Sequence, residues 1–251
     1  MSMKFKLFLT IILSGMIAVS CRTSGEKSGK AGEKVSPEDE GWVVLFDGTS
    51  TDNFRGYGKE AFPEQGWVID EDGSLHVQGS GKGEAGGGGG DIITKKMYGN
   101  FELSLEWKVS EGGNSGIFYL GQELEGKPIY ESAPEMQILD NERHPDAKLG
   151  KDGNRQAGSL YDLIPAVPQN TKPVGEWNEV RILVYKGTVV HFMNGEQVLE
   201  YHLWTDNWKE MCANSKFKDW TEFIDTATEG YIGLQDHGDD VWFRNIKIKE
   251  M

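Results

Sequence analysis

The chain has 251 residues and a formal net charge of −14, because 40 acidic residues outnumber 26 lysines and arginines. This balance disfavours nucleic acid and anionic membrane surfaces as partners, and it leaves neutral ligands open. Eight Trp, eight Tyr and eleven Phe are many for an acidic chain. Aromatic side chains of this number fill a core or stack on the C–H faces of sugar rings.

The N-terminal part has the pattern of an export signal followed by a tether. Two lysines precede an apolar run from Leu7 to Val19, which is too short to span a bilayer comfortably. The residues before Cys21 resemble a bacterial lipobox, so we expect a signal at 1–20 and lipidation of Cys21, with plain secretion as the alternative. Residues 21–40 have few apolar side chains and predict a flexible tether. We expect a lipid-anchored protein of the bacterial cell envelope, periplasmic or at the cell surface.

Residues 41–251 have a length that suits one all-β domain better than two small ones. Cys212 is the only cysteine in that range, so no intrachain disulfide is expected once Cys21 is lipidated. Alternating or apolar runs predict strands along the whole range. These strands are expected at Trp42–Phe46, Trp67–Ile69, Ser74–Val77, Asp91–Thr94, Asn100–Val109, Gly112–Tyr119, Pro134–Asn141, Ala157–Leu163, Trp177–Tyr185, Thr188–Met193, Gln197–His202, Tyr231–Gln235 and Val241–Lys249.

Turn residues separate these runs. Asp70–Gly73 and Asn194–Gly195 are typical of hairpin turns. The five glycines Gly86–Gly90 predict a mobile loop, or a backbone that passes close to a ligand. Only Asp206–Asp225 has apolar residues at roughly helical spacing. A dozen short strands without helices between them predict an all-β fold of two packed antiparallel sheets, a jelly-roll sandwich.

The stretch Pro134–Asn141 carries the chemistry that is easiest to see. Glu135 and Gln137 alternate with Met136 and Ile138, so a strand here would bury one face and show a carboxylate and an amide on the other. The plain interpretation is a half-buried strand with a solvated face. The functional interpretation is the floor of a binding cleft.

Motifs in a fixed order make the sequence similar to the 3-keto-disaccharide hydrolase family, bacterial secreted domains with a concanavalin A-like jelly roll. The motifs span nearly all of 41–251. They are Leu45–Gly48, Gly99–Leu103, Gly113–Ile117, Glu135–Asp140, Tyr161–Asp162, Trp177–Glu179, His191–Gly195, Ile232–Gly238 and Phe243–Ile246.

This resemblance implies an enzyme that cleaves glycosides already oxidised to a ketone at carbon 3. The ketone acidifies the hydrogen on carbon 2, so a base can remove it while an acid protonates the departing glycosidic oxygen; water then adds back. Such a site needs a general acid, a general base and donors aimed at the enolate oxygen.

We assign candidate residues from residue type and from these motifs. Glu135 and His237 are the acid/base candidates, since a carboxylate and an imidazole titrate near working pH when tuned by their surroundings. A solvated glutamate and a structural histidine are the alternatives. The remaining candidates are expected to bind substrate, with a salt bridge as the alternative for the arginine. They are Asn114, Gln137, Tyr161, Asp162, His191, Gln235 and Arg244.

No cofactor is firmly indicated, although Asp140 and Asp162 offer oxygen ligands that suit a divalent cation such as Ca²⁺. Two other functions remain open. A conventional retaining glycosidase would use Glu135-x-Gln137-x-x-Asp140, but its middle acid is an amide here and its last acid is one methylene shorter. A non-catalytic carbohydrate-binding module would use the aromatic and amide side chains without an acid/base pair.

Overall fold

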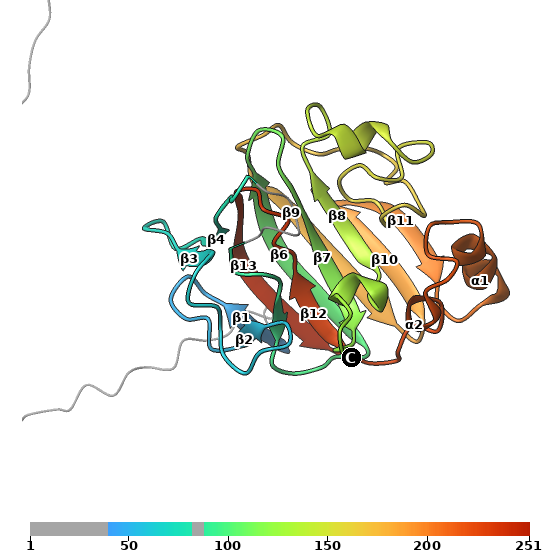
Figure 1. The fold of residues 1–251 in the computed structure, drawn as a ribbon, viewed down its shortest axis with the longest axis horizontal. Helices are drawn as coiled ribbons and strands as arrows, with labels where there is room; N and C mark the ends of the chain where they lie inside the picture. The colour runs from blue at the N-terminus through green and yellow to red at the C-terminus, as the bar shows by residue number, and fades with distance from the viewer. Residues whose placement is uncertain (1–39, 82–87) are drawn as a thin grey trace, which may run out of the picture. The chain divides into compact units, whose positions relative to one another are not determined.

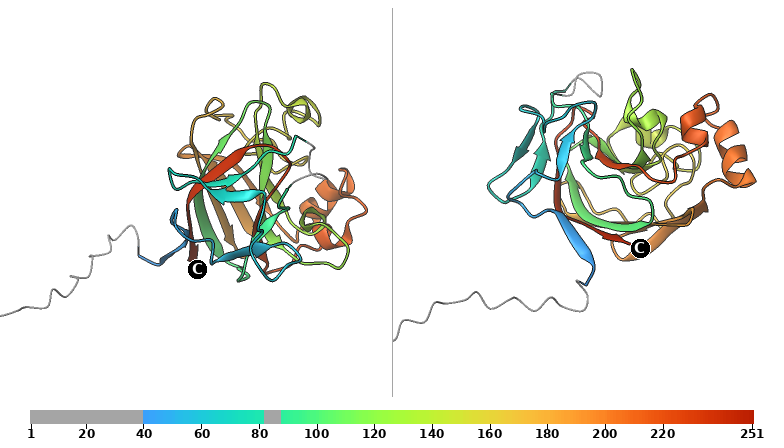
Figure 2. Two further views of the ribbon diagram at one scale, coloured as in Figure 1. Left: turned by 60° about the vertical axis from the view of Figure 1, so that its left-hand side comes forward. Right: turned by 90° about the horizontal axis from the view of Figure 1, so that it is seen from below.

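Two antiparallel sheets form the fold of the computed structural model, which describes residues 40–81 and 88–251 (Figures 1 and 2). The larger sheet has the order β11 (Glu196–His202), β10 (Thr188–Met193), β9 (Asn178–Tyr185), β6 (Phe101–Val109), β13 (Val241–Glu250), β4 (Leu75–Val77) and β3 (Trp67–Ile69), and β1 (Trp42–Phe46) also pairs with β13. The smaller sheet has the order β2 (Phe54–Gly56), β5 (Ile92–Thr94), β12 (Tyr231–Leu234), β7 (Asn114–Gly121) and β8 (Glu135–Leu139). The predicted all-β jelly-roll sandwich is confirmed.

Most predicted strands are present within a residue or two, because the period-two alternation marks them directly. In β6 and β9 the apolar residues point into the core and the charged ones point away from it. Ala157–Leu163 is wrong as a strand. It makes only isolated bridges through Leu160, and its backbone follows the free edge of β8, where Tyr161 N donates to Glu135 O. This loop therefore covers an edge strand that would otherwise be exposed.

The single predicted helix is two short helices, α1 (Asp206–Ala213) and α2 (Thr221–Ile224). Thr205 caps α1 by accepting a hydrogen bond from Trp208 N at 3.1 Å. The chain then turns between the two helices rather than continuing one axis. Two 3₁₀ turns complete the elements, η2 (Ile129–Glu131) and η3 (Pro145–Lys148).

The predicted export signal and lipidation site lie outside the described residues, as does nearly all of the predicted tether. In the part of the chain that the structure describes, no helix is both long enough and apolar enough to cross a membrane.

The smaller sheet is buried on both faces at β7 and β8. Met136 and Ile138 point into the main core between the sheets, whereas Phe118 on the outer face packs with Ile129 of η2. Glu135 is only 8% exposed and Gln137 only 1%. Other parts of the chain therefore cover this polar face, so the plain interpretation of a solvated face is wrong.

His191 does not line a cleft, which corrects the prediction made for it. The ring is fully buried in the core between the sheets. Its Nε2 lies 2.8 Å from the Tyr119 hydroxyl, which lies 2.7 Å from the Tyr201 hydroxyl, and its Nδ1 lies 3.1 Å from Gly158 O. These partners satisfy both ring nitrogens, so His191 has a structural role.

We expect His191 to make the fold sensitive to acid. Burial lowers the pKa of His191 from 6.5 to about 4, so the unfolded chain takes up this proton before the folded chain does. Stability is fully present above pH 6.5 and is lost as the pH falls toward 4, by about 3 kcal/mol from this group. Urea unfolding of the wild type and of His191→Gln at several pH values measures this pH dependence of the free energy of unfolding. An equal pH dependence in both proteins would place the proton uptake elsewhere.

Candidate active site

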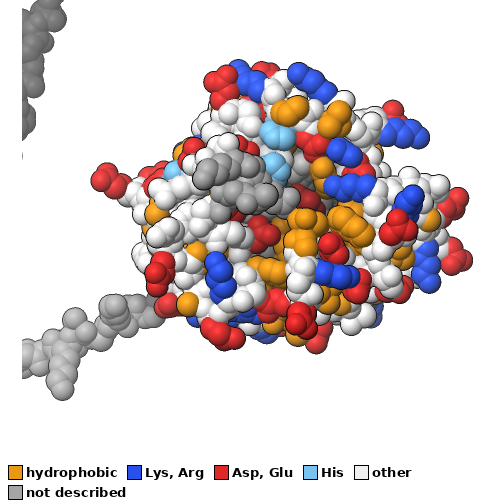
Figure 3. All heavy atoms as spheres, in the orientation of Figure 1, with side chains coloured by type: hydrophobic (Ala, Val, Ile, Leu, Met, Phe, Trp, Pro, Cys, Tyr) orange, Lys and Arg blue, Asp and Glu red, His pale blue; other side chains and the backbone are white. Residues whose placement is uncertain are grey.

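A cavity of about 270 Å³ lies on the outer face of the smaller sheet. Figure 3 shows hydrophobic side chains gathered on this side of the molecule, over β7, β8 and β12, with acidic and basic side chains around them. Six of the predicted site residues line the cavity, and six further residues complete the wall. The lining residues are Asn114, Glu135, Gln137, Tyr161, Gln235 and His237, together with Tyr130, Ala133, Lys216, Phe217, Trp220 and Phe223.

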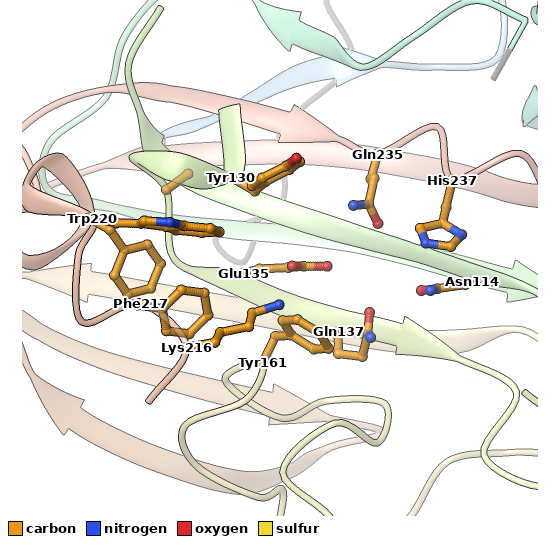
Figure 4. A pocket seen from close by; sticks show the side chains of 12 residues that line it. Asn114, Tyr130, Glu135, Gln137, Tyr161, Lys216, Phe217, Trp220, Gln235 and His237 are labelled. Carbon is orange, nitrogen blue, oxygen red and sulfur yellow. The ribbon is translucent and has the colours of Figure 1, made fainter. Parts of the chain in front are cut away.

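Glu135 lies at the centre of the cavity floor, with an aromatic end on one side and a polar end on the other (Figure 4). Its carboxylate lies over Gly116 of the neighbouring strand β7. A Cβ added at Gly116 would lie 2.0 Å from Oε1 of Glu135, which is far inside van der Waals contact. The missing side chain at Gly116 thus makes the space in which the carboxylate sits.

Amide side chains form the polar end of the cavity. Gln137 follows two residues after Glu135 on the same face of β8, and Asn114 lies across on β7. Among the described residues, Oδ1 of Asn114 is buried without a hydrogen-bond partner. Buried amide oxygens in native proteins are normally paired, so this acceptor is suited to a hydroxyl group of a bound ligand.

His237 lies at the same polar end, in the turn after β12 (Figure 4). Asp236 shapes this turn: its carboxylate accepts hydrogen bonds from the backbone N–H groups of Gly89, Gly90 and Gly238 at 2.9–3.1 Å. The described end of the five-glycine run is therefore held against the residue next to His237. A Cβ at Gly89 would lie 2.5 Å from the Trp67 ring, which explains why glycine is needed there.

Tyr161 is held in place by a charged network behind the cavity wall. Its hydroxyl donates to Asp146 at 2.8 Å, and Arg155 binds Asp146 at 2.7 Å and Asp162 at 2.5 Å. Burial and the Asp146 carboxylate raise the pKa of Tyr161, so the phenol stays protonated. Asp162 does not line the cavity, and it acts through Arg155 and Asp146 to hold Tyr161 in the cavity wall.

Aromatic rings form the opposite end. Phe217 and Phe223 stack with their centroids 4.2 Å apart, and Trp220 lies 5.2 Å from Phe217 and 5.6 Å from Tyr130. Such a wall offers flat apolar faces to a sugar ring or to an aglycone. Three of these rings come from the α1–α2 segment, where the sequence predicted only a helix, and Tyr130 comes from η2. The recurrence of aromatic residues beyond Ala213 was the signal that could have identified Phe217, Trp220 and Phe223.

Lys216 was also not predicted. It lies in the turn between α1 and α2, and its ammonium reaches into the cavity 4.0 Å from the centroid of the Tyr161 ring (Figure 4). Burial lowers the pKa of Lys216, and the negative charge of Glu135 partly opposes that shift.

Arg244 lies on the larger sheet, away from the cavity, which corrects its assignment as a substrate-binding residue. Its guanidinium binds Glu106 at 2.6 Å and covers the Trp177 ring at 4.1 Å. The salt bridge considered as its alternative role is the one observed. Because Phe243 points into the core, the alternation of β13 directs Arg244 outward.

The two carboxylates considered for a cation are occupied by other donors. Asp140 accepts hydrogen bonds from the backbone N–H groups of Gly112 and Glu142, and it forms a salt bridge with Arg143. Asp162 forms a salt bridge with Arg155. They cap turns and hold loops, and the structure does not bring them together as a cation site.

A different group of potential metal ligands does converge. His144, His237 and Asp239 offer ligand atoms within 4.8 Å of one another, the one such group in the described ranges. Two imidazoles and a carboxylate suit a transition metal better than Ca²⁺. However, Nδ1 of His144 accepts a hydrogen bond from Asp146 N at 3.2 Å, which caps η3 and places the ring proton on Nε2. Binding a metal through Nε2 would require His144 to give up this cap.

The fold and the cavity together define a jelly-roll enzyme of the glycoside-cleaving class, with a buried carboxylate, amides and aromatic faces around a sugar-sized space. Comparison with known proteins agrees with this class. The model of the 3-keto-alpha-glucoside-1,2-lyase-like domain matches residues 41–249, and the chain belongs to that family.

Relatives support the same assignment. A 3-keto-disaccharide hydrolase of Bacteroides thetaiotaomicron is 55% identical over 249 residues, covering 90% of this chain and 85% of the relative. A crystal structure from Parabacteroides distasonis, of a protein provisionally assigned as a glycosyl hydrolase, is 28% identical with a TM-score of 0.73, covering 85% of this chain and 95% of that one. A second structure from that organism with the same provisional assignment is 28% identical with a TM-score of 0.65, covering 84% and 99%.

Proposed function

We propose that the protein cleaves glycosides whose sugar carries a ketone at carbon 3, by elimination followed by addition of water. One observation carries this proposal. Among the described residues that line the cavity, Glu135 is the one carboxylate, and the position two residues on is the amide Gln137. A conventional glycosidase needs two carboxyl groups flanking the bond, about 5–9.5 Å apart, whereas elimination beside a ketone needs one acid/base pair.

The cavity provides the groups that this chemistry needs. Glu135 and His237 divide two proton transfers: one group takes the hydrogen from carbon 2, and the other protonates the departing glycosidic oxygen. Breaking the C1–O bond leaves a double bond between carbons 1 and 2, to which water adds. We assign Asn114 and Gln137 to the sugar hydroxyls and the aromatic end to the leaving group, because these side chains line the two ends of the cavity. The name of the Bacteroides relative supports this substrate class.

Paired substrates test the proposal. The enzyme is incubated with 4-nitrophenyl glucoside and with its 3-keto derivative, and released nitrophenol is followed by absorbance. We expect turnover of the keto sugar only, and deuterium from heavy water at carbon 2 of the product, because elimination exchanges that hydrogen. Turnover of the plain glucoside without deuterium incorporation would instead indicate direct hydrolysis, and binding without turnover a carbohydrate-binding module.

We also propose that a lipid on Cys21 anchors the protein in the bacterial cell envelope, so the domain meets its sugar outside the cytoplasm. The lipobox-like pattern before Cys21 supports this. Replacing Cys21 by Ser is expected to move the protein from the membrane fraction to the soluble fraction, as read by fractionation and immunoblotting. Replacing Cys212, which is buried in the domain, should not change the fraction. Membrane retention of Cys21→Ser would refute the anchor.

A further inference from the structure

Lys216 presents a positive charge to the cavity, and among the acids around it the carboxylate of Glu135 most opposes the lowering of its pKa. The two other acids whose charge acts on Lys216, Asp146 and Asp162, are bound to Arg155 at 2.7 and 2.5 Å. Within residues 40–81 and 88–251, Lys216 forms no salt bridge with a carboxylate; its close contact is the face of the Tyr161 ring at 4.0 Å. The turn between α1 and α2 thus directs an ammonium into the space above the cavity floor (Figure 4).

Lys216 is exposed as a residue, but its ammonium end lies among apolar rings at the cavity. Rings of Phe217, Trp220 and Phe223 line the same cavity, so they replace part of the water around the charge at some cost. A cation–π contact with Tyr161 offsets part of this cost. A fixed positive charge of this kind is most useful when negative charge develops in front of it, because the site needs no reorganisation at that moment.

We propose that Lys216 is a catalytic residue whose ammonium binds the oxygen on carbon 3 as that oxygen becomes an enolate. This inference rests on the proposed function. The base takes the proton from carbon 2, the C–H electron pair forms the C2–C3 double bond, and the carbonyl pair moves to the oxygen facing Lys216. The enolate then reforms the ketone, its electron pair makes the C1–C2 double bond, and the C1–O bond breaks. Lys216 donates a hydrogen bond throughout and keeps its proton.

The position of Lys216 relative to Glu135 fits this role. Glu135 lies on the floor and Lys216 enters from the adjacent wall, so a sugar ring between them places carbon 2 and the oxygen on carbon 3 against different groups. The bound substrate is neutral, and the charge appears only when the carbon 2 hydrogen leaves. Lys216 should therefore act on kcat far more than on KM.

Kinetics of three variants test this inference. Lys216→Met keeps the length of the side chain and removes its charge, and Lys216→Arg keeps the charge. Lys218→Met is the matched control because Lys218 is exposed, as Lys216 is, but does not line the cavity. With 4-nitrophenyl 3-keto-glucoside we expect Lys216→Met to lower kcat by about 10²–10³-fold with KM changed less than about threefold. Lys216→Arg should recover part of the loss, and Lys218→Met should match the wild type. Thermal unfolding checks that all three variants fold.

A second measurement does not depend on turnover. Kojic acid is a six-membered oxygen heterocycle whose ionised hydroxyl beside a carbonyl imitates the enolate. We expect it to bind the wild type about tenfold tighter than Lys216→Met, with the difference growing as the pH rises through the ionisation of kojic acid. Equal kojate affinity, or a Lys216→Met kcat within about threefold of the wild type, would overturn the role of Lys216. A wild type that leaves keto sugars intact would refute the proposed function, while the kojate comparison still decides on Lys216.

Discussion

Glu135→Gln is expected to lower kcat on a 3-keto glycoside by about 10³-fold or more, because the amide can neither accept nor return a proton. The two side chains have nearly the same shape, so the amide fits over Gly116 and the fold should persist. Stopped-flow or steady-state assays with 4-nitrophenyl 3-keto-glucoside measure the loss, and circular dichroism measures folding.

Glu196→Gln is the matched control, since Glu196 is an exposed glutamate at the start of β11 and lies outside the cavity wall. It should behave as the wild type does. If Glu135→Gln retains activity within about tenfold of the wild type, Glu135 takes no part in proton transfer.

Gly116→Ala is expected to reduce kcat by about 10²-fold or more while adding only one methyl group. The backbone at Gly116 is not left-handed, so alanine suits the strand, but its Cβ would meet the Glu135 carboxylate at 2.0 Å and force it aside. Displacement of a catalytic group by about 1 Å can cost a hundredfold in rate. The same assay measures this loss.

A double-mutant cycle separates this mechanism from general damage to the sheet. If Gly116→Ala acts by moving Glu135, it should cost little in the Glu135→Gln background, where the catalytic carboxylate is already lost. Equal costs in both backgrounds would show that the methyl group disturbs the site in another way.

Both predictions depend on a strand that the sequence identified and on surroundings that it did not. The alternation of Glu135 and Gln137 with Met136 and Ile138 correctly predicted which residues share a face. The same pattern left two interpretations open, a solvated polar face and the floor of a cleft, and with Glu135 8% exposed in the cavity the structure agrees with the second. Alternation records only the difference between the two faces, and it carries no information about what covers the polar one.

Residue type was a weaker guide to the site than position. His191 and Arg244 have the chemistry of site residues, yet one is satisfied by Tyr119 and Gly158 in the core and the other by Glu106 on the outer face of the larger sheet. Lys216 had no distinguishing motif. Its proposed role follows from its place in the turn after α1, from which its side chain reaches the cavity.

The sequence alone determined the all-β sandwich, most strand positions and the family, because strand periodicity, turn residues and ordered motifs are local properties of the chain. The tertiary structure decided which polar side chains meet. Asn114, Glu135, His237 and Lys216 come from separate segments, and their convergence depends on strand pairing and on the path of the α1–α2 segment over the sheet. Those long-range contacts cover the polar face of β8 and remove water from it. The sequence of the strand alone does not determine this covering, which encloses the cavity.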